Sequence, residues 1–173
     1  MTASLPLSTH LLAPSVLQQE LLPSYTLPSA FNSTTRITPA APDAKAVDLI
    51  LACDWAGVNA GVMLLRRSAW TDMLLDLWTD PLLIAQDWPA REQDALVYLL
   101  DKHDSIWEHV GVVTQRDLNA NAFESENGWH EGDLFVHFAG CWVENECEAN
   151  WEKFWRRRSP VPVRYLKGVR EWA

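Results

Sequence analysis

A histidine near the end of an apolar run, shortly before a glycine turn, is the residue best suited to chemistry in this sequence. The apolar run is Leu134 to Phe138, and Ala139 and Gly140 follow it. Alternate side chains of a β-strand share a face, so His137 would be the last residue on its face, at the carboxyl end where open α/β sheets bind ligands. A neutral imidazole there can bind a metal ion, and a glycine turn lets the backbone approach a phosphate. A core histidine with one hydrogen bond is the competing interpretation.

Structural zinc is another interpretation of this region, because His130, His137, Cys141 and Cys147 are all zinc-binding residue types. Their spacing argues against it. A strand rises about 3.3 Å per residue, so ligands four or more residues apart share an ion only if the chain reverses sharply. With Cys53 the chain has 3 cysteines, an odd count that leaves the disulfide pairing and the redox compartment open.

Two apolar runs and two amphipathic segments precede this histidine and must position it. The runs 47–53 and 60–65 are short, apolar and rich in β-branched residues, so they predict buried strands. A helix is predicted from the N-cap Ser68 to Asp80, with Trp70, Met73, Leu74, Leu77 and Trp78 on one apolar face.

A second helix is predicted to begin with Pro89 in its first turn and to end near His103, with Leu96, Val97 and Leu100 facing inward. The same spacing places Gln93 on the buried stripe. An amide on an inward face needs a polar partner, and a ligand can supply one.

The remaining chain predicts a strand over 110–114, a long loop to about residue 133, and a helix over 144–158 that covers the sheet. Cys147, Trp151, Phe154 and Trp155 would form the apolar face of that helix. Alternating strands and helices indicate an α/β fold with a largely parallel or mixed sheet.

Composition narrows the function classes. The chain has 173 residues, 48% of them hydrophobic, which suits one domain. We expect residues 1–46 to form a Pro/Ser/Thr-rich arm, residues 47–158 to form the domain, and residues 159–173 to form a tail. A formal net charge of -9 makes nucleic acid an unsuitable partner. No signal peptide or membrane-spanning run is present in this sequence. Its 10 tryptophans can stack on sugar rings, although most are expected in the core.

Four ordered blocks resemble glycosyltransferase family 34, which includes fungal α-1,2-galactosyl and α-1,6-mannosyl transferases and plant xyloglucan xylosyltransferases. The blocks are Asn59–Arg66, Leu74–Trp78, Glu92–Leu100 and Gly132–Cys141. The fungal, Golgi mannan-type branch is the most similar. The resemblance implies the C-terminal part of a GT-A-type nucleotide-sugar transferase fold, with a mixed sheet flanked by helices. It also implies retaining hexosyl transfer, galactosyl or mannosyl, from a nucleotide-sugar donor to a glycan acceptor.

The resemblance assigns roles to seven residues. His137 matches a histidine that joins an Asp-x-Asp motif in holding Mn²⁺, while Gln93 and Glu92 match catalytic positions near the reacting carbon and the acceptor. The substrate-binding positions are Asn59, Ala60, Gly61 and Gly140. The family also implies a Golgi membrane location and a possible complex with related glycosyltransferases.

The sequence departs from the family pattern in two respects. It contains no Asp-x-Asp motif, and Trp142 stands where plant members carry a lysine near the diphosphate. We therefore expect the chain to be incomplete as a catalyst, with the remaining metal ligands on a segment that this sequence does not contain. A non-catalytic glycan-binding or partner module of the same family is the alternative, and a coding region that begins upstream of Met1 is a third possibility.

Overall fold

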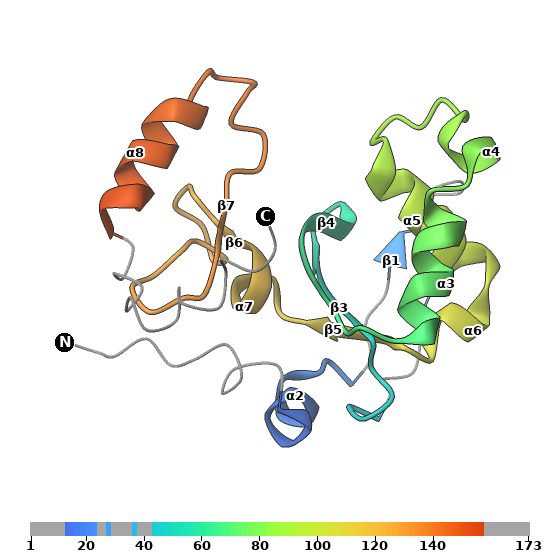
Figure 1. Cartoon of the computed structure of the whole chain (residues 1–173). Helices are drawn as coiled ribbons and strands as arrows, with labels where there is room; N and C mark the ends of the chain where they lie inside the picture. The colour runs from blue at the N-terminus through green and yellow to red at the C-terminus, as the bar shows by residue number, and fades with distance from the viewer. Residues whose placement is uncertain (1–12, 24–26, 29–35, 38–42, 158–173) are drawn as a thin grey trace, which may run out of the picture.

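A three-stranded mixed sheet forms the centre of the molecule (Figure 1). The computed structural model describes residues 13–23, 27–28, 36–37 and 43–157. Strand β3 (Leu49–Asp54) lies in the middle, antiparallel to β4 (Gly57–Leu65) and parallel to β5 (Val110–Val113). The three strands predicted from apolar runs are confirmed, and so is the mixed sheet.

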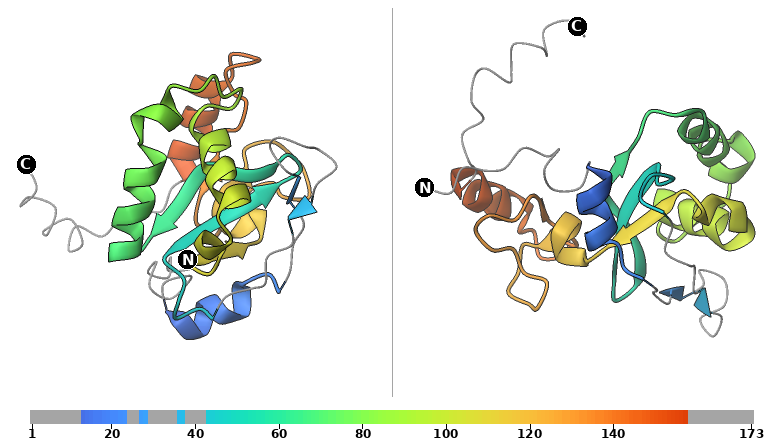
Figure 2. Two further views of the ribbon diagram at one scale, coloured as in Figure 1. Left: turned by 90° about the vertical axis from the view of Figure 1, so that its right-hand side faces the viewer. Right: turned by 90° about the horizontal axis from the view of Figure 1, so that it is seen from below.

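Both faces of this sheet are covered by helices, as the views in Figure 2 show. Leu49 and Leu51 of β3 pack on one side with the buried residues of α5 (Glu92–Lys102), while Ile50 and Ala52 pack on the other. This alternation follows from the two-residue repeat of a strand. The first face is covered by α3 (Ala69–Trp78), α4 (Pro81–Ile84), α5 and α6 (Asp104–Trp107), the second by α2 (Pro14–Glu20) and α7 (Gln115–Asn119).

Helix α2 packs on the sheet although it lies within the arm expected over residues 1–46. Its Leu17 and the following Leu21 are buried against Val47. Gly111 of β5 makes room for them, because a Cβ there would lie 2.6 Å from Leu21 Cδ2. The described residues of the arm also form a pair of short antiparallel strands, β1 (Leu27–Pro28) and β2 (Arg36–Ile37).

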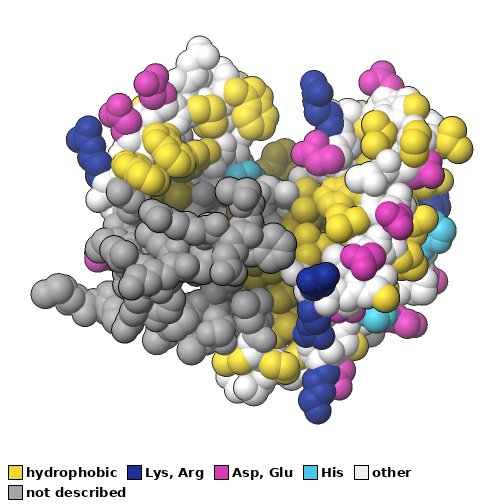
Figure 3. Space-filling view, viewed as in Figure 1, with side chains coloured by type: hydrophobic (Ala, Val, Ile, Leu, Met, Phe, Trp, Pro, Cys, Tyr) yellow, Lys and Arg dark blue, Asp and Glu magenta, His cyan; other side chains and the backbone are white. Residues whose placement is uncertain are grey.

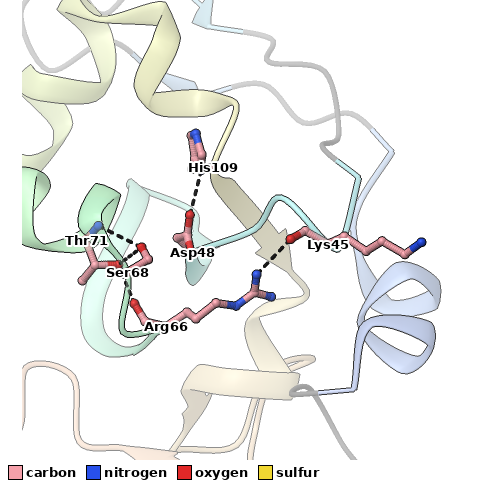
Figure 4. Close-up of polar contacts among 6 residues, drawn as sticks. All are labelled: Lys45, Asp48, Arg66, Ser68, Thr71 and His109. Carbon is pink, nitrogen blue, oxygen red and sulfur yellow. Dashed lines mark hydrogen bonds and ion pairs between the residues drawn. The ribbon is translucent and has the colours of Figure 1, made fainter.

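A polar network joins the start of β3, the start of β5 and the end of β4 (Figure 4). Asp48 Oδ2 lies 2.7 Å from His109 Nδ1, which ties the start of β3 to the start of β5. Ser68 caps α3 as predicted, since its hydroxyl accepts a hydrogen bond from Thr71 N at 3.1 Å. Thr71 Oγ1 in turn donates to the carbonyl of Arg66 at 2.6 Å, so α3 is fixed to the end of β4.

Helix α5 begins later than its sequence indicates. Pro89 does not lie in its first turn; the chain turns through residues 89–91, and Arg91 adopts a φ of 52° before the helix begins at Glu92. That left-handed residue cannot continue a helix, which explains the shift. Leu96, Val97 and Leu100 face the core as predicted.

The apolar face predicted for α3 is narrower than its sequence suggests. Leu74 is buried, and Trp70 and Trp78 pack against the same core, but Met73 and Leu77 are 43% and 40% exposed.

The segment that carries His137 is not part of the central sheet, which corrects the prediction of a strand over 134–138. Only β7 (Val136–His137) is extended, and it pairs in parallel with β6 (Ala120–Asn121). The region expected to be a long loop therefore contains α7 and β6. With only two residues each, β6 and β7 depend on tertiary contacts for their position.

The prediction that the last helix covers the sheet is also wrong. Helix α8 (Cys147–Arg157) lies beside β6 and β7, away from the central sheet. Its buried residue, Phe154, contacts the rings of Trp129 and Phe138. Trp151 and Trp155 stack on each other and remain 55% and 49% exposed.

We predict that α2 contributes to the stability of the folded chain. Leu17→Ala should lower the free energy of unfolding by about 2–5 kcal/mol, since it empties a buried site. Leu82→Ala is the matched control, because Leu82 is 79% exposed and should change stability by less than about 0.5 kcal/mol. Urea denaturation followed by circular dichroism measures both. Equal, small effects would show that α2 does not belong to the core.

Candidate functional site

An irregularity in the β3–β4 pairing creates the candidate site. Ile50 pairs with Leu64 and Ala52 pairs with Asn59, so four residues of β4 (60–63) lie between these pairs where β3 has only Leu51. The extra residues of β4 include Ala60 and Gly61, whose N–H groups are directed to side chains instead of to β3. Such bulges are typical of places where a strand redirects groups for function.

The side chain of Asn59 supports this irregular segment. It is 5% exposed; its Oδ1 accepts a hydrogen bond from Gly61 N at 2.8 Å, and its Nδ2 donates to Asp54 Oδ2 at 2.8 Å. Its amide is therefore occupied by protein groups. In the structure, Asn59 supports the backbone of the bulge.

Gln93 supports the same segment from α5. Its Oε1 accepts a hydrogen bond from Ala60 N at 3.0 Å, which supplies the protein partner that an inward-facing amide requires. Its Nε2 has no partner in the described part of the chain and can donate to a ligand. Since Gln93 and Ala60 are 33 residues apart, the bond joins the α5 side of the sheet to the bulge.

His137 reaches the bulge from the opposite side. A Cβ built on Gly61 would overlap Cε1 and Nε2 of the His137 imidazole and lie 2.9 Å from Asn59 Oδ1. The imidazole therefore packs directly on Gly61, and any other residue at that position would displace it. His137 is the last residue of β7, and its carbonyl accepts a hydrogen bond from Ala122 N at 3.2 Å.

Two buried atoms of this site lack protein partners among the described residues. They are Nδ1 of His137 and Oδ1 of Asn119, a residue that is fully buried at the end of α7. Asn119 Nδ2 lies 3.3 Å from Asn59 Oδ1, so both atoms belong to the same neighbourhood. Unpaired buried polar atoms are uncommon in folded proteins and point to a ligand or a water molecule.

The electrostatics of the site keep the imidazole neutral. Burial lowers the pKa of His137, and the nearby Asp54 carboxylate raises it by less, so the net shift is downward. A depressed pKa means that the ring is uncharged near neutral pH and can act as a ligand or a hydrogen-bond partner. We call Asp54, Asn59, Gln93, Asn119 and His137 the polar cluster.

An ion pair fixes the segment between α7 and β7. Arg116 Nε and Nη2 bind the two oxygens of Asp133 at 3.0 Å each. Burial raises the pKa of Asp133. The hydrogen bonds from Arg116 and from His130 N together lower this pKa by more, so the net shift is downward. The pair is half exposed and contributes modestly, yet it holds the chain that leads to His137 against α7.

Glu92 and Gly140 lie at the site's borders. The Glu92 side chain is exposed at the start of α5, and no hydrogen bond joins it to the polar cluster among the described residues. Gly140 adopts a φ of 68°, and nothing described lies within 4 Å of a Cβ built there, so its turn faces open space. Beyond it, Cys141 and Cys147 form a disulfide, which removes both from the zinc interpretation.

Asp54 and Asn119 are the members of the polar cluster that sequence analysis missed. Both form hydrogen bonds with Asn59. Asp54 lies at the end of β3, and Asn119 lies 60 positions after Asn59 in the sequence. Asp54 carried a signal, since it is the first charged residue after an apolar run. Asn119 carried none, because its segment was expected to be a loop.

The polar cluster offers hydrogen bonds and one imidazole, but not a complete metal site. Within the residues that the structure describes, no three His, Cys, Asp or Glu side chains are grouped closely enough to hold an ion. The cluster is uncharged except for Asp54, and amides and carboxylates suit the hydroxyl groups of a carbohydrate. Figure 3 shows the surface hollowed between the part over α8 and the part over α3 to α5.

Comparison with known proteins places the chain among the glycosyltransferases. Residues 1–148 match the galactosyl transferase GMA12/MNN10 family, and the chain belongs to that family. The probable alpha-1,2-galactosyltransferase gmh2 of Schizosaccharomyces pombe is 40% identical over 158 residues, which cover 87% of this chain and 46% of that protein. The probable alpha-1,2-galactosyltransferase gmh1 of the same yeast is 38% identical, over 89% of this chain and 48% of that protein.

A mannosyltransferase is among the relatives. The probable alpha-1,6-mannosyltransferase MNN10 of Saccharomyces cerevisiae is 32% identical over 117 residues, 58% of this chain and 29% of that protein. The chain thus spans about half the length of the curated galactosyltransferases gmh2 and gmh1. No solved structure matches it. The family to which the chain belongs is the one that the sequence resemblance predicted.

We predict an energetic coupling between Gly61 and His137. Gly61→Ala should lower the free energy of unfolding by about 1–3 kcal/mol, because the new methyl group overlaps the imidazole. In a His137→Ala background the same change should cost at least about 1 kcal/mol less, since the overlap is gone. Urea unfolding of the four chains gives the cycle. Additive effects would mean that the two residues do not touch.

We predict that Cys53 is protected from thiol reagents in the folded chain. Burial and then the Asp54 carboxylate raise its pKa from 9.0 to about 12, so almost no thiolate exists at pH 8. With Cys141 and Cys147 paired, Ellman's reagent reads Cys53 alone. The reaction should be at least about a hundredfold slower in buffer than in denaturing urea, by the loss of thiolate. Comparable rates at pH 8 would contradict the burial of this thiol.

Proposed function

We propose that the polar cluster binds the donor sugar of a retaining hexosyltransferase, which transfers a galactosyl or mannosyl group from a nucleotide sugar to a glycan acceptor. One observation carries this proposal: Asn59, Ala60, Gly61, Gln93 and His137 come from separate segments and meet at one bulge. These are the positions at which the chain is similar to donor-site residues of its family. The fold that we propose for the whole domain is GT-A.

The hydrogen bonds indicate which of these residues support the backbone and which can bind the sugar. Asn59 and the Oε1 atom of Gln93 hold the backbone of Ala60 and Gly61 in place. The free Nε2 of Gln93 then donates to the sugar or to the leaving oxygen. An amide orients such groups without forming a stable covalent bond, which suits a residue close to the reacting carbon.

Glu92 is proposed to contact the acceptor. It is the first residue of α5, and its side chain is exposed. A carboxylate accepts hydrogen bonds from sugar hydroxyls. We assign the turn at Gly140 to the donor side, where its open backbone can approach a phosphate.

The charge of the polar cluster favours a divalent cation as a further component. The cluster contains one carboxylate and a neutral imidazole, and none of its members is cationic, so it repels an anionic diphosphate on its own. A bound Mn²⁺ would neutralise the leaving group. His137 supplies one ligand, with an unpartnered Nδ1 and an Nε2 that faces Gly61. One imidazole does not complete a site, so no reaction step is assigned to the ion.

The proposed location is the Golgi, which is where a family that builds glycans would act. In the described ranges of the chain, no helix is both long enough and apolar enough to cross a lipid bilayer. A complex with related glycosyltransferases remains a proposal from the family resemblance.

We predict that Mn²⁺, added with UDP-galactose or GDP-mannose, binds beside Gly61 through His137. In amide NMR spectra of the ¹⁵N-labelled chain, the Gly61 signal should broaden strongly, because paramagnetic relaxation acts only at short range. His137→Ala should abolish the broadening. His103→Ala should leave it intact, since His103 is exposed at the far end of α5 from Gln93. Broadening that survives His137→Ala would remove this residue from the metal site.

A further inference from the structure

Trp55 is the most exposed large apolar side chain among the described residues. It is 95% exposed, at the tip of the hairpin between β3 and β4. Some tryptophans elsewhere have partners: Trp70 stacks on His109, and Trp78 Nε1 donates to the carbonyl of Glu92. An indole left in water forgoes the burial that its large apolar surface would otherwise gain. A single exposed residue is ordinary, so the meaning of Trp55 depends on its place.

The hairpin tip that carries Trp55 is built rigidly. Asp54 Oδ1 accepts a hydrogen bond from Ala56 N at 2.8 Å, and Asp54 pairs with Gly57 across the turn. Gly57 adopts a φ of 119°, which glycine alone adopts without strain. The indole is thus presented to solvent by a defined turn, so little conformational entropy of the backbone is lost when it meets a ligand.

The same turn belongs to the polar cluster. Asp54 uses one oxygen for the turn and the other for Asn59, so Trp55 is the immediate neighbour of a residue that supports the donor segment. In Figure 1 the hairpin end lies between the side that carries β6, β7 and α8 and the side that carries α4 and α5.

We propose that Trp55 is a stacking platform for a pyranose ring of the acceptor glycan, and that Asp54 accepts a hydroxyl hydrogen bond from the same sugar. The proposal rests on the function proposed above. The electron-rich face of the indole suits the C–H face of a sugar, and a carboxylate has lone pairs left after two hydrogen bonds. Ring face and carboxylate together recognise a neutral, hydroxyl-rich ring.

Charge distinguishes the acceptor from the other flat group that could stack there, the base of the nucleotide. The Asp54 carboxylate adjoins Trp55, and the chain has a formal net charge of -9. Both repel the phosphates that accompany a base, whereas a neutral glycan meets no such opposition. The donor segment at Gly61 is also covered by His137, so the exposed tip is left for the group that arrives from outside.

Fluorine NMR of the full chain tests this inference without requiring turnover. The tryptophans are labelled with 5-fluorotryptophan, and the Trp55 signal is assigned by its loss in Trp55→Phe. We expect α-1,6-linked mannotriose to move this signal saturably, and Trp55→Ala to weaken binding by about tenfold or more. Trp55→Phe keeps a ring face and should stay within about threefold of the original affinity. Trp151→Ala is the matched control, an exposed tryptophan on α8 whose loss should change nothing.

Three outcomes overturn the inference. The first is a Trp55 signal that stays still while mannotriose saturates the chain, and the second is no binding of mannotriose at millimolar concentration. The third is a Trp55 signal that moves with UDP or GDP and not with mannotriose, which would assign the indole to the base. The donor site is read separately by the Mn²⁺ broadening of Gly61. If Gly61 does not broaden but the Trp55 signal shifts with mannotriose, only the donor site is rejected. If Gly61 broadens but the Trp55 signal does not shift, only the stacking platform is rejected.

Discussion

The contact between the imidazole of His137 and the backbone of Gly61 is the constraint on which the rest of the site depends. The strands β6 and β7 form their own small sheet, with no strand shared with the central one. A glycine at position 61 lets the imidazole reach the central sheet, where any Cβ would exclude it. The ring therefore positions the β6–β7 region against β4, and the hydrogen bond between Asn119 and Asn59 reinforces that placement.

The bulge in β4 makes this contact possible at a cost that the polar cluster offsets. Extra residues in one strand leave backbone N–H groups without a partner in the ladder, and an unpaired buried N–H is expensive. Gln93 accepts the hydrogen bond of Ala60 N, and Asn59 accepts that of Gly61 N. Both amides would be poor choices in an ordinary core. Their presence on inward faces follows from the shape of β4.

Local patterns in the sequence were enough to predict most of the central sheet, whereas Asn59, Ala60 and Gly61 were assigned to the site by the family resemblance. Runs of apolar residues located β3, β4 and β5, and the spacing of Gln93 from Leu96 and Leu100 predicted its inward position. The strand predicted around His137 was wrong in its extent and in the sheet it joins, because a short run of four apolar residues and a histidine does not reveal which strand it pairs with. Asp54 and Asn119 were missed as members of the site, since their roles depend on tertiary contacts to Asn59.

The distribution of engaged and free atoms in the polar cluster separates support from recognition. Asn59 has both amide atoms bound within the protein, so its substitution should act through the backbone of Gly61. Among the described residues, Gln93 Nε2 has no partner, and neither do the buried atoms His137 Nδ1 and Asn119 Oδ1. A folded chain tolerates such atoms where a ligand or water completes their bonding. The groups with unused bonding capacity all border the bulge, so the geometry that satisfies the backbone also defines where a sugar would be held.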